Sequence, residues 1–360
     1  MAMSVPEQPY RTGPRSSNIH SNIPSVSIAL CVYNGERYLE QQVESLFRQS
    51  RRPDEIVAVD DASSDRSFAI LQALAQHSAI PMRVHRNDTN LGYRRNFDRA
   101  MSLTRGDVIF LCDQDDFWER DKTERCLQPF LDDSSVMLVH TDAALVDADL
   151  RSLDAGLFDA LELTAAERTM EDRGLGYEVL LKRNIVTGAT TAVRRDVFER
   201  AAPFPDEWVH DEWLALAASL MGRLVRLDHA LVHYRQHGKN QIGARQRGVP
   251  QKLKVLFGND GKYQQRLLRR LQRLQQRAGA LMDRPQPARL QLLERTLRHA
   301  AVRAALPAEH WRRLPGVLRE TLNGGYFRYS RGWISIVRDF FGPIDARVAL
   351  GNRESWASSR

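Results

Sequence analysis

No stretch of this 360-residue chain is apolar over the roughly 18 residues that a membrane-spanning helix needs, which excludes such a helix. The first 24 residues, Met1 to Pro24, also lack the apolar core of a secretory signal peptide. They are rich in Pro, Ser and Asn, and we expect a disordered lead-in. The three cysteines form no CxxC pair, and an odd number without a signal sequence favours a reducing compartment. These absences predict a cytoplasmic protein.

Two nucleotide-binding signatures are missing as well. No GxGxxG follows the first predicted strand, and no GxxxxGK[ST] occurs in the chain. Glycine-rich loops of these types hold phosphates with backbone N–H groups. Any nucleotide bound here must therefore be held by carboxylates and a metal ion.

Negative charge is scarce in the last third of the chain. Residues 245–360 contain 24 Lys and Arg against 8 Asp and Glu, whereas residues 1–244 contain 28 against 37. With 42% hydrophobic and 27% charged residues, the composition is globular and allows one large or two smaller domains. The pattern indicates an acidic body followed by a basic tail, whose partner would be an anionic membrane, a nucleic acid or the acidic body itself.

Strand and helix patterns alternate four times in the first part of the chain. Apolar runs predict strands at residues 25–32, 55–59, 82–85 and 108–112, and the segments between them show helical spacing. This order predicts a parallel sheet with helices on both faces. Further on, we expect a helical segment at 149–183, a strand at 190–193, a helix at 196–201 and strands at 224–233. In a parallel sheet, ligands bind at the carboxyl ends of the strands, so the polar residues that end these runs should converge.

The run from Val108 to Trp118 is the most informative stretch. It reads as a buried strand that ends in three acids, Asp113, Asp115 and Asp116. Carboxylates gathered in this way repel one another unless a cation lies between them, and oxygen ligands suit Mg²⁺ or Mn²⁺. The alternative is an acidic turn that caps the next helix.

Seven motifs in order resemble family 2 glycosyltransferases of GT-A fold, and the later ones resemble their rhamnosyltransferase-like branch. The resemblance covers residues 25–244, between the lead-in and a basic, helical region at 245–360. The motifs lie at residues 27–36, 59–65, 90–92, 113–118, 184–188, 210–213 and 234–240.

The resemblance implies a nucleotide-sugar site at the strand ends. Asp60 matches the acid that hydrogen-bonds the nucleotide base, and Val32 and Asn34 match the loop that lines the base. Asp113 matches the first acid of the family's DxD motif, near the ribose or the metal.

The resemblance also implies a metal site and a catalytic base. Asp115 matches the acid that holds the metal on the diphosphate, Asp116 could share that role, and His237 matches a histidine that completes the coordination. Asp211 matches the base of inverting members, with His210 where a glutamate is common. The plain alternative for Asp211 is a helix cap, and for His237 a solvated loop residue.

The activity implied is metal-dependent, inverting transfer of a sugar, L-rhamnose or another deoxyhexose, to a hydroxyl of a polysaccharide or lipid-linked glycan precursor. The donor implied is dTDP-rhamnose or a UDP-sugar. A carboxylate base and a divalent ion are what such a displacement requires. One rival is a sugar-phosphate nucleotidyltransferase, although Tyr33 to Glu36 is not its glycine-rich basic loop. Another is a non-enzymatic membrane-binding or nucleic-acid-binding protein, which leaves the acid clusters unexplained; we expect no nucleic acid.

Further expectations concern side chains outside the acid clusters. Leucines at helical spacing from Leu267 to Leu281 predict a helix that packs on the catalytic domain. The mixture of aromatics and arginines from Tyr326 to Phe341 is the candidate for contact with an anionic membrane. We expect Trp118 and Trp213 to be packing residues, and Lys122 to lie at the surface or to face a phosphate.

Overall fold

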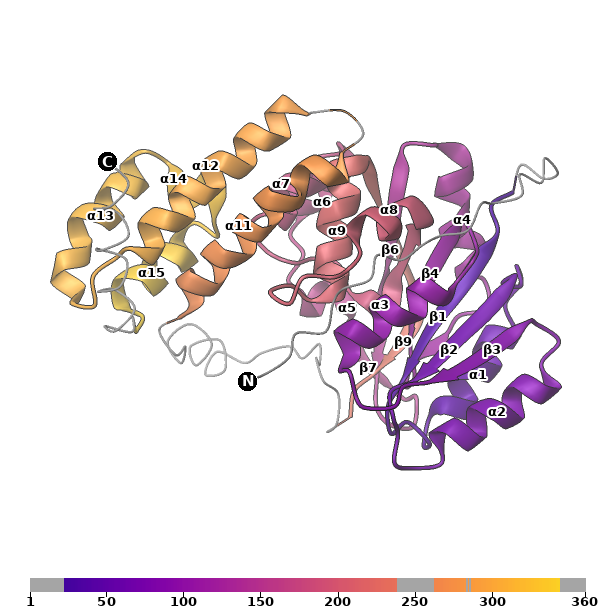
Figure 1. Ribbon diagram of the computed structural model, residues 1–360. Helices are drawn as coiled ribbons and strands as arrows, with labels where there is room; N and C mark the ends of the chain where they lie inside the picture. Colours follow the sequence, from indigo (N-terminus) through magenta and orange to yellow (C-terminus); the bar gives the residue numbers. More distant parts are fainter. Residues whose placement is uncertain (1–22, 238–261, 283, 285, 344–360) are drawn as a thin grey trace, which may run out of the picture.

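In a computed structural model, residues 23–237, 262–282, 284 and 286–343 are described. These residues form a nine-stranded mixed sheet with helices on both faces, followed by a separate group of helices (Figure 1). The expected α/β class with a helical C-terminal region is confirmed. The predicted lead-in, apart from Ile23 and Pro24, and the predicted boundary at residue 244 lie outside the described residues.

Four parallel strands build one half of the sheet, in the order β3-β2-β1-β4. Every residue of β1 and β2 is buried, because helices cover both faces of this half of the sheet. Alternate residues of β1 therefore enter two separate cores. The bounds are β1 (Val26–Val32), β2 (Glu55–Asp60), β3 (Met82–Arg86) and β4 (Val108–Asp113).

Three helices connect these strands. Leu39, Val43 and Leu46 of α1 enter the core on one face of β1, and Phe97 and Met101 of α3 enter the core on the other. The bounds are α1 (Leu39–Phe47), α2 (Ser67–His77) and α3 (Tyr93–Leu103).

The order of the strands reverses at β1, which lies between β2 and β4. At its carboxyl end, Val32 pairs with Asp60 of β2, and Cys31 pairs with Asp113 of β4. The predicted convergence of the strand ends is thus confirmed, and it occurs at the switch point where ligands bind in such sheets.

The other half of the sheet is mixed. β8 runs antiparallel to both β4 and β6, and β6 runs parallel to β9. β6 has no counterpart among the predicted strands, because His140, Thr141 and Asp142 interrupt its apolar pattern. The bounds are β5 (Phe117–Trp118), β6 (Val136–Val146), β7 (Ser152–Gly156), β8 (Thr191–Arg194) and β9 (Arg223–Arg235).

Helix α9 (His210–Met221) is the central helix of the molecule. Its residues His210 to Leu220 are all buried, because the helix contacts strands β6, β8 and β9 as well as helices α3, α7, α8 and α11. The remaining helices of this part are α4 (Lys122–Asp132), α5 (Leu157–Ala160), α6 (Ala165–Asp172), α7 (Gly176–Leu180), α8 (Arg195–Ala201) and a short 3-10 turn (Gly188–Thr190).

The C-terminal helices pack on this body through α11. Leu271, Leu274 and Leu281 are fully buried in the same core as Trp213 of α9, so the predicted packing of the leucine stripe is confirmed. Burial of one such leucine stabilises the fold by about 1.5–3 kcal/mol. The bounds are α11 (Tyr263–Leu281), α12 (Pro287–Ala304), α13 (His310–Leu322), α14 (Gly325–Tyr329) and α15 (Trp333–Phe341).

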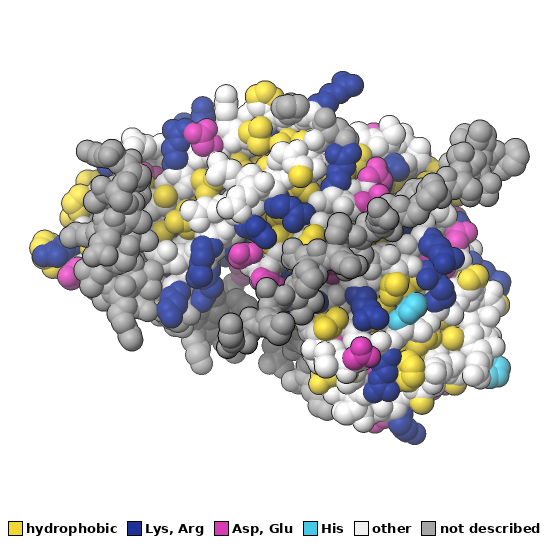
Figure 2. All heavy atoms as spheres, in the orientation of Figure 1, with side chains coloured by type: hydrophobic (Ala, Val, Ile, Leu, Met, Phe, Trp, Pro, Cys, Tyr) yellow, Lys and Arg dark blue, Asp and Glu magenta, His cyan; other side chains and the backbone are white. Residues whose placement is uncertain are grey.

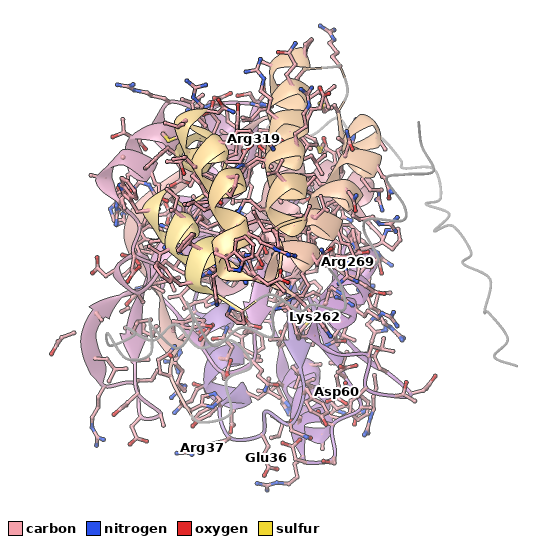
Figure 3. All side chains as sticks on the ribbon, turned by 90° about the vertical axis from the view of Figure 1, so that its left-hand side faces the viewer. Glu36, Arg37, Asp60, Lys262, Arg269 and Arg319 are labelled. Atoms are coloured by element: carbon pink, nitrogen blue, oxygen red, sulfur yellow. The ribbon has the colours of Figure 1, made fainter. Side chains whose placement is uncertain are left out.

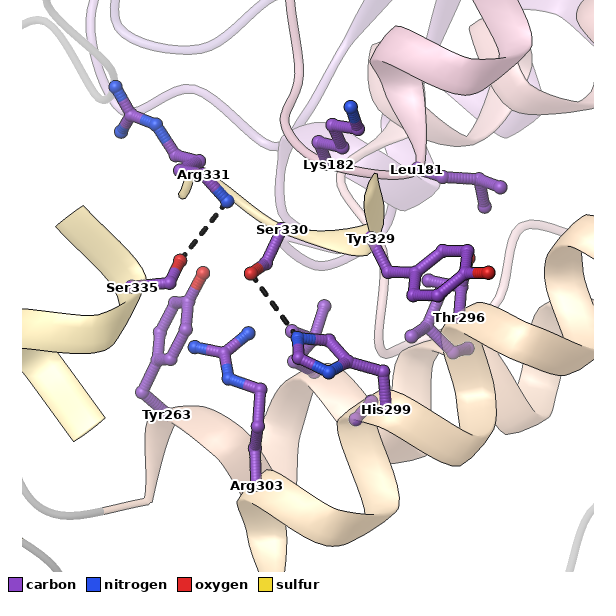
Figure 4. A pocket seen from close by; sticks show the side chains of 13 residues that line it. Leu181, Lys182, Tyr263, Thr296, His299, Arg303, Tyr329, Ser330, Arg331 and Ser335 are labelled. Atoms are coloured by element: carbon purple, nitrogen blue, oxygen red, sulfur yellow. Dashed lines mark hydrogen bonds between the residues drawn. The ribbon is translucent and has the colours of Figure 1, made fainter. Parts of the chain in front are cut away.

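A small cavity lies where the end of α7 meets the C-terminal helices (Figure 4). His299 contacts the hydroxyl of Ser330 at 3.3 Å, and the backbone N–H of Arg331 donates to Ser335 at 3.1 Å. Two pairs of polar groups in the lining thus contact each other. The acids at the strand ends are absent from its described lining, so we place the candidate active site elsewhere.

Within the described residues, no helix is both long and apolar enough to cross a membrane. The three cysteines are buried and unpaired.

Candidate active site

Two loops at the carboxyl ends of β1 and β4 are joined by one side chain. The Tyr33 N–H donates to Oε1 of Gln114 at 2.6 Å, and Nε2 of Gln114 donates back to the Tyr33 carbonyl at 2.9 Å. A Cβ atom on Gly35 would collide with the Gln114 amide, so glycine allows this close approach without displacing that side chain. The acidic loop is therefore held against the first loop, a role for Gln114 that the motif spacing did not reveal.

Asn34 joins the first loop to the loop after β2. Its side-chain oxygen accepts from the Ser64 N–H at 2.8 Å, and its own N–H donates to Ser63 Oγ at 2.9 Å. Asn34 has a φ of 50°, a left-handed conformation that asparagine tolerates better than most residues. Val32, two residues earlier, ends β1, and its side chain is buried in the core.

Asp60 is fully buried at the end of β2. One of its oxygens, Oδ2, accepts from the Ser63 N–H at 3.1 Å and lies 3.3 Å from Nε of Arg86. The other oxygen, Oδ1, has no hydrogen-bond partner among the described residues. A buried acceptor without a partner is costly, which is expected where a ligand supplies the missing donor.

The next residue, Asp61, organises the neighbouring loop. Its carboxylate accepts from the side chain of Asn87 at 2.6 Å and from the N–H groups of Leu91 and Gly92 at 2.8 and 2.9 Å. The Asn-Leu-Gly motif is thus fastened to the end of β2. The motif itself is visible in the sequence, whereas its partner is not.

The three acids after β4 differ in their environments. Burial, together with the nearby charges of Asp115 and Asp211, raises the pKa of Asp113 to about 7. Burial, together with Asp115 and Asp113, also raises the pKa of Asp116 well above its usual range. Like charges held this close out of water are destabilising, and a divalent cation between them would relieve the repulsion.

Asp115 meets the histidine that the motifs single out. Its Oδ2 lies 2.7 Å from Nε2 of His237, and both side chains are largely buried. The carboxylates of the acid cluster are the oxygen donors that suit Mn²⁺ or Mg²⁺, and the imidazole of His237 lies in contact with one of them. In the described part of the chain, no group of three such side chains is already arranged to hold a metal ion.

Asp116 lies deeper than Asp115. Its Oδ1 accepts from the backbone N–H of Arg235 at 3.1 Å, while Oδ2 is buried without a partner among the described residues. The guanidinium of Arg235 donates to the carbonyl of Asp115 at 2.7 Å and stacks 4.3 Å from the ring of Tyr38. Arg235 therefore supports the acidic loop from β9, a role that its motif did not predict.

The expectation that Lys122 lies at the surface or faces a phosphate is wrong. It is fully buried, with its ammonium 3.4 Å from the centre of the Trp118 ring and donating to the carbonyl of Ala189 at 2.7 Å. Burial lowers the pKa of Lys122 to about 8, although the acids nearby oppose the shift. Its positive charge lies beneath the acid cluster rather than at the surface, because the Trp118 face and a backbone carbonyl replace water around it.

Trp118 and Trp213 are both buried packing residues, as expected.

Asp211 lies in the first turn of α9, after the N-cap residue Val209. Its Oδ2 accepts from the Gly188 N–H at 3.0 Å, and its Oδ1 accepts from the Glu212 N–H at 2.6 Å. Burial raises the pKa of Asp211 to about 6, and these hydrogen bonds oppose the shift. A carboxylate with a pKa near 6 is well matched to proton abstraction near neutral pH.

His210 is neutral. Its ring stacks 4.2 Å from that of Phe97, and burial lowers its pKa to about 3. The histidine that replaces a common glutamate therefore adds no positive charge beside Asp211.

The acids at the carboxyl ends of β2 and β4 form one candidate ligand site, and this part of the chain resembles a known family in sequence. The model for "Glycosyl transferase family 2" matches residues 27–201. This segment, just under half of the chain, is similar to the family, and the family resemblance inferred from the motifs is confirmed over it.

Three relatives illustrate the similarity. An uncharacterized glycosyltransferase of Nostoc sp. is 26% identical over 221 residues, covering 60% of this chain and 66% of the relative. The putative glycosyltransferase EpsH of Bacillus subtilis is 26% identical over 223 residues, with coverages of 59% and 61%. The putative teichuronic acid biosynthesis glycosyltransferase TuaG of Bacillus subtilis is 29% identical over 175 residues, with coverages of 48% and 63%. The chain thus spans less than two thirds of the length of each.

Two solved structures are similar at low identity. TarS 1-349 of S. aureus in complex with UDP is 18% identical with a TM-score of 0.47, and the similarity covers 92% of both chains. The mannosyltransferase PcManGT of Pyrobaculum calidifontis, in complex with GDP-Man and Mn²⁺, is 17% identical with a TM-score of 0.46, covering 94% of this chain and 81% of that one.

Proposed function

We propose that the protein is an inverting glycosyltransferase that moves a sugar from a nucleotide-diphosphate donor to a hydroxyl group of a growing polysaccharide or lipid-linked glycan. The observation that carries this proposal is that Asp211 is fastened next to β4: its Oδ2 accepts from the Gly188 N–H at 3.0 Å, and the 3-10 turn that contains Gly188 contacts β4. The charge of Asp211, at the start of α9, acts on Asp113, at the end of β4. A donor-binding acid and a candidate base thus share one site.

The donor would lie over the ends of β1 and β2. The unpartnered oxygen of Asp60 would accept a hydrogen bond from the nucleotide base, beside the loop that Val32 and Asn34 form. Asp113, at the end of the neighbouring strand, would face the ribose or the metal.

A divalent cation would be held chiefly by Asp115 and His237. Such an ion supplies a positive charge that stabilises the leaving diphosphate. Asp116 lies beneath this pair and is engaged by Arg235, so we assign it to the wall of the metal site, where its buried oxygen can share the ion's charge.

Asp211 would take the proton from the acceptor hydroxyl as that oxygen attacks the sugar. Its two hydrogen bonds hold the carboxylate in place, and its raised pKa makes it a stronger base than an exposed aspartate. A single base serves a single displacement, which inverts the configuration at the anomeric carbon; a retaining double displacement would need a nucleophile in addition.

The finer assignment is L-rhamnose from dTDP-rhamnose, with a UDP-sugar as the alternative donor. It is supported by the resemblance of residues 184–188, 210–213 and 234–240 to the rhamnosyltransferase-like branch. The name of TuaG, which places that protein in teichuronic acid biosynthesis, supports a polysaccharide acceptor. A lipid-linked acceptor would require the enzyme to work at a membrane surface.

The test is a panel of nucleotide-sugars with Mn²⁺, scored for release of the nucleoside diphosphate in the presence and absence of acceptor glycans. Of the donors tested, we expect dTDP-rhamnose to give the strongest release of the nucleoside diphosphate. We expect Asp211→Asn to abolish that release. Release of pyrophosphate from a nucleoside triphosphate and a sugar phosphate would instead identify a nucleotidyltransferase. Absence of turnover with every donor would contradict the proposal.

A further inference from the structure

One face of α13 is apolar and points away from the protein. Trp311, Leu314, Leu318 and Leu322 follow one another at intervals of three or four residues, so they form a single row along the helix. Their exposed fractions are 71%, 53%, 52% and 78%. The opposite face of the same helix is the packed one, since Val317 is buried. The exposed row is therefore additional to the face that folding uses.

The neighbouring helices α14 and α15 also expose large apolar side chains. Trp333, Ile334 and Phe341 are exposed on α15, and Phe327 of α14 lies edge-to-face against Trp333 at 5.4 Å. Large exposed apolar patches on soluble proteins mark sites of interaction with proteins, membranes or ligands.

The two helices are held together by a buried arginine. Arg313 of α13 donates to the carbonyls of Asp339 and Phe340 at 3.1 Å and to that of Gly342 at 2.7 Å. The exposed apolar row of α13 thus lies on a helix that is held in place by its packing against α15.

Negative charge is sparse on the outer surface of this region. Residues 305–343 contain six arginines and three acids. Asp339 is fully buried and accepts from Arg303 at 2.6 Å and from Tyr326 at 2.8 Å. Glu320 faces a buried histidine at 2.7 Å, so Glu309 is the one acid of this segment that is exposed. The arginines exposed at the surface include Arg312, Arg319 and Arg328.

We propose that α13, with α14 and α15, docks the protein on an anionic lipid bilayer. Trp311 and the three leucines would enter the boundary between headgroups and acyl chains, and the flanking arginines would meet lipid phosphates. The aromatic segment 326–341, which its composition singles out as the membrane candidate, is then one part of a larger surface centred on α13. The proposal depends on this surface alone and holds whichever donor the active site uses.

A second copy of the chain fits the surface poorly. In a two-fold interface the same patch meets itself, so the arginines of one copy would face those of the other, with Glu309 as the one exposed acid of the segment to pair with them. A bilayer offers an apolar layer beneath a negatively charged one, which complements both features.

The position of the surface suits docking. α13 lies at the end of the molecule farthest from β2 and β3, and hydrophobic side chains beside a basic one are visible there at the left edge of Figure 2. In Figure 3, Arg319 lies among the C-terminal helices and Asp60 lies well below it in the catalytic body. A bilayer in contact with α13 would leave the donor loops uncovered.

The experiment is co-sedimentation of the full-length protein with vesicles of phosphatidylcholine, alone or mixed with phosphatidylglycerol at about three to one, at low and high salt. The test variants are Trp311→Ser/Leu318→Ser and Arg312→Gln/Arg319→Gln. The matched control is Leu131→Ser, an exposed leucine of α4 in the catalytic body. Circular dichroism and thermal melting show that each variant is folded, and the altered side chains are exposed ones whose loss the fold tolerates.

We expect binding to the mixed vesicles at low salt and weaker binding at high salt. The apolar variant should bind on the order of tenfold more weakly, and the arginine variant should lose its preference for phosphatidylglycerol. The control should bind like the unaltered protein. Protein that stays in the supernatant at low salt, or an apolar variant that binds normally, would overturn the proposal. So would a dimer, or a nucleic-acid complex in a mobility-shift assay, that the apolar variant abolishes while vesicle binding persists.

Discussion

Arg270 of α11 forms an ion pair with Glu212, the residue that directly follows Asp211. Its guanidinium also lies 3.9 Å from the centre of the Trp208 ring, and its carbonyl accepts from Trp208 Nε1 at 3.1 Å. The helix that carries Arg270 lies beyond the segment that matches the family model. The C-terminal region therefore contributes to the surroundings of the candidate base.

Replacing Arg270 by glutamine should shift the pH dependence of the reaction. The positive charge of Arg270 opposes the raised pKa values of Asp211 and Glu212, so its loss should raise the pKa of Asp211 further. The acidic limb of kcat/KM against pH should move upward by about one unit or less. Arg273→Gln, an exposed arginine on the same helix, is the matched control. An unchanged acidic limb in Arg270→Gln would show that the ion pair is structural only.

The unaltered enzyme should itself show an acidic limb. Asp211 must be ionised to accept a proton, and burial raises its pKa to about 6, so kcat/KM should rise as the pH increases through about 6. The stability of the fold should change with pH in the opposite direction. Since the folded pKa lies above the unfolded one, Asp211 stabilises the fold below its unfolded pKa and loses that contribution as the pH rises towards 6. A kcat/KM that is flat from pH 5 to 7 would contradict the assignment.

Asp211→Asn should lower turnover by at least about 10²-fold, because the amide cannot accept the acceptor's proton. Donor affinity, measured by calorimetry with the nucleoside diphosphate and Mn²⁺, should survive, since Asp60 and Asp115 lie on other elements. Asp196→Asn, an exposed acid at the start of α8, is the control. Near-normal turnover in Asp211→Asn would mean that another group acts as base.

Chelation should abolish turnover, and Mn²⁺ or Mg²⁺ should restore it. Asp115→Asn and His237→Ala should each weaken metal-dependent nucleotide binding by about tenfold or more while the protein remains folded. His229→Ala, an exposed histidine of β9, should bind normally. Full turnover in excess EDTA would exclude the metal site.

Gly35→Ala should weaken donor binding through Gln114. The added methyl group would displace the Gln114 amide, which joins the first loop to the acidic loop. The cost should be about 1–3 kcal/mol in stability or binding. In a Gln114→Ala background, the same substitution should cost much less, because the side chain it meets is gone. Additive effects in this double-mutant cycle would show that Gly35 and Gln114 act independently.

The parallel half of the sheet and the position of its acids followed from local patterns. β1, β2 and β4 are apolar runs of strand length, each followed by polar residues. The topology of alternating strands and helices obliges those ends to meet at one edge. Local patterns alone therefore sufficed to predict that Asp60 and Asp113 lie near one another. Their proposed roles depended on the resemblance and remain predictions.

The helical spacing of Leu271, Leu274 and Leu281 likewise sufficed to predict an apolar face, and the contact of α11 with α9 buries it.

Other features depended on neighbours that are distant in the chain. Lys122 is buried because the Trp118 face and the Ala189 carbonyl happen to surround it, and no local pattern marks such a lysine. β6 was not predicted, because polar residues interrupt its apolar run. These polar residues are tolerated because neighbouring elements supply partners; for example, Glu171 lies 2.8 Å from His140.

The outer face of α13 also could not be predicted from local sequence. Leucines at helical spacing predict a buried face, and those of α11 are buried, whereas Leu314, Leu318 and Leu322 of α13 are exposed. The spacing is alike in both helices. The sequence determined that each helix has an apolar face. Only the tertiary structure, through the packing of α13 against α15, decided that the leucine face of α13 remains in contact with solvent. The physical reason is that burial depends on the neighbouring elements and not on the spacing of the leucines.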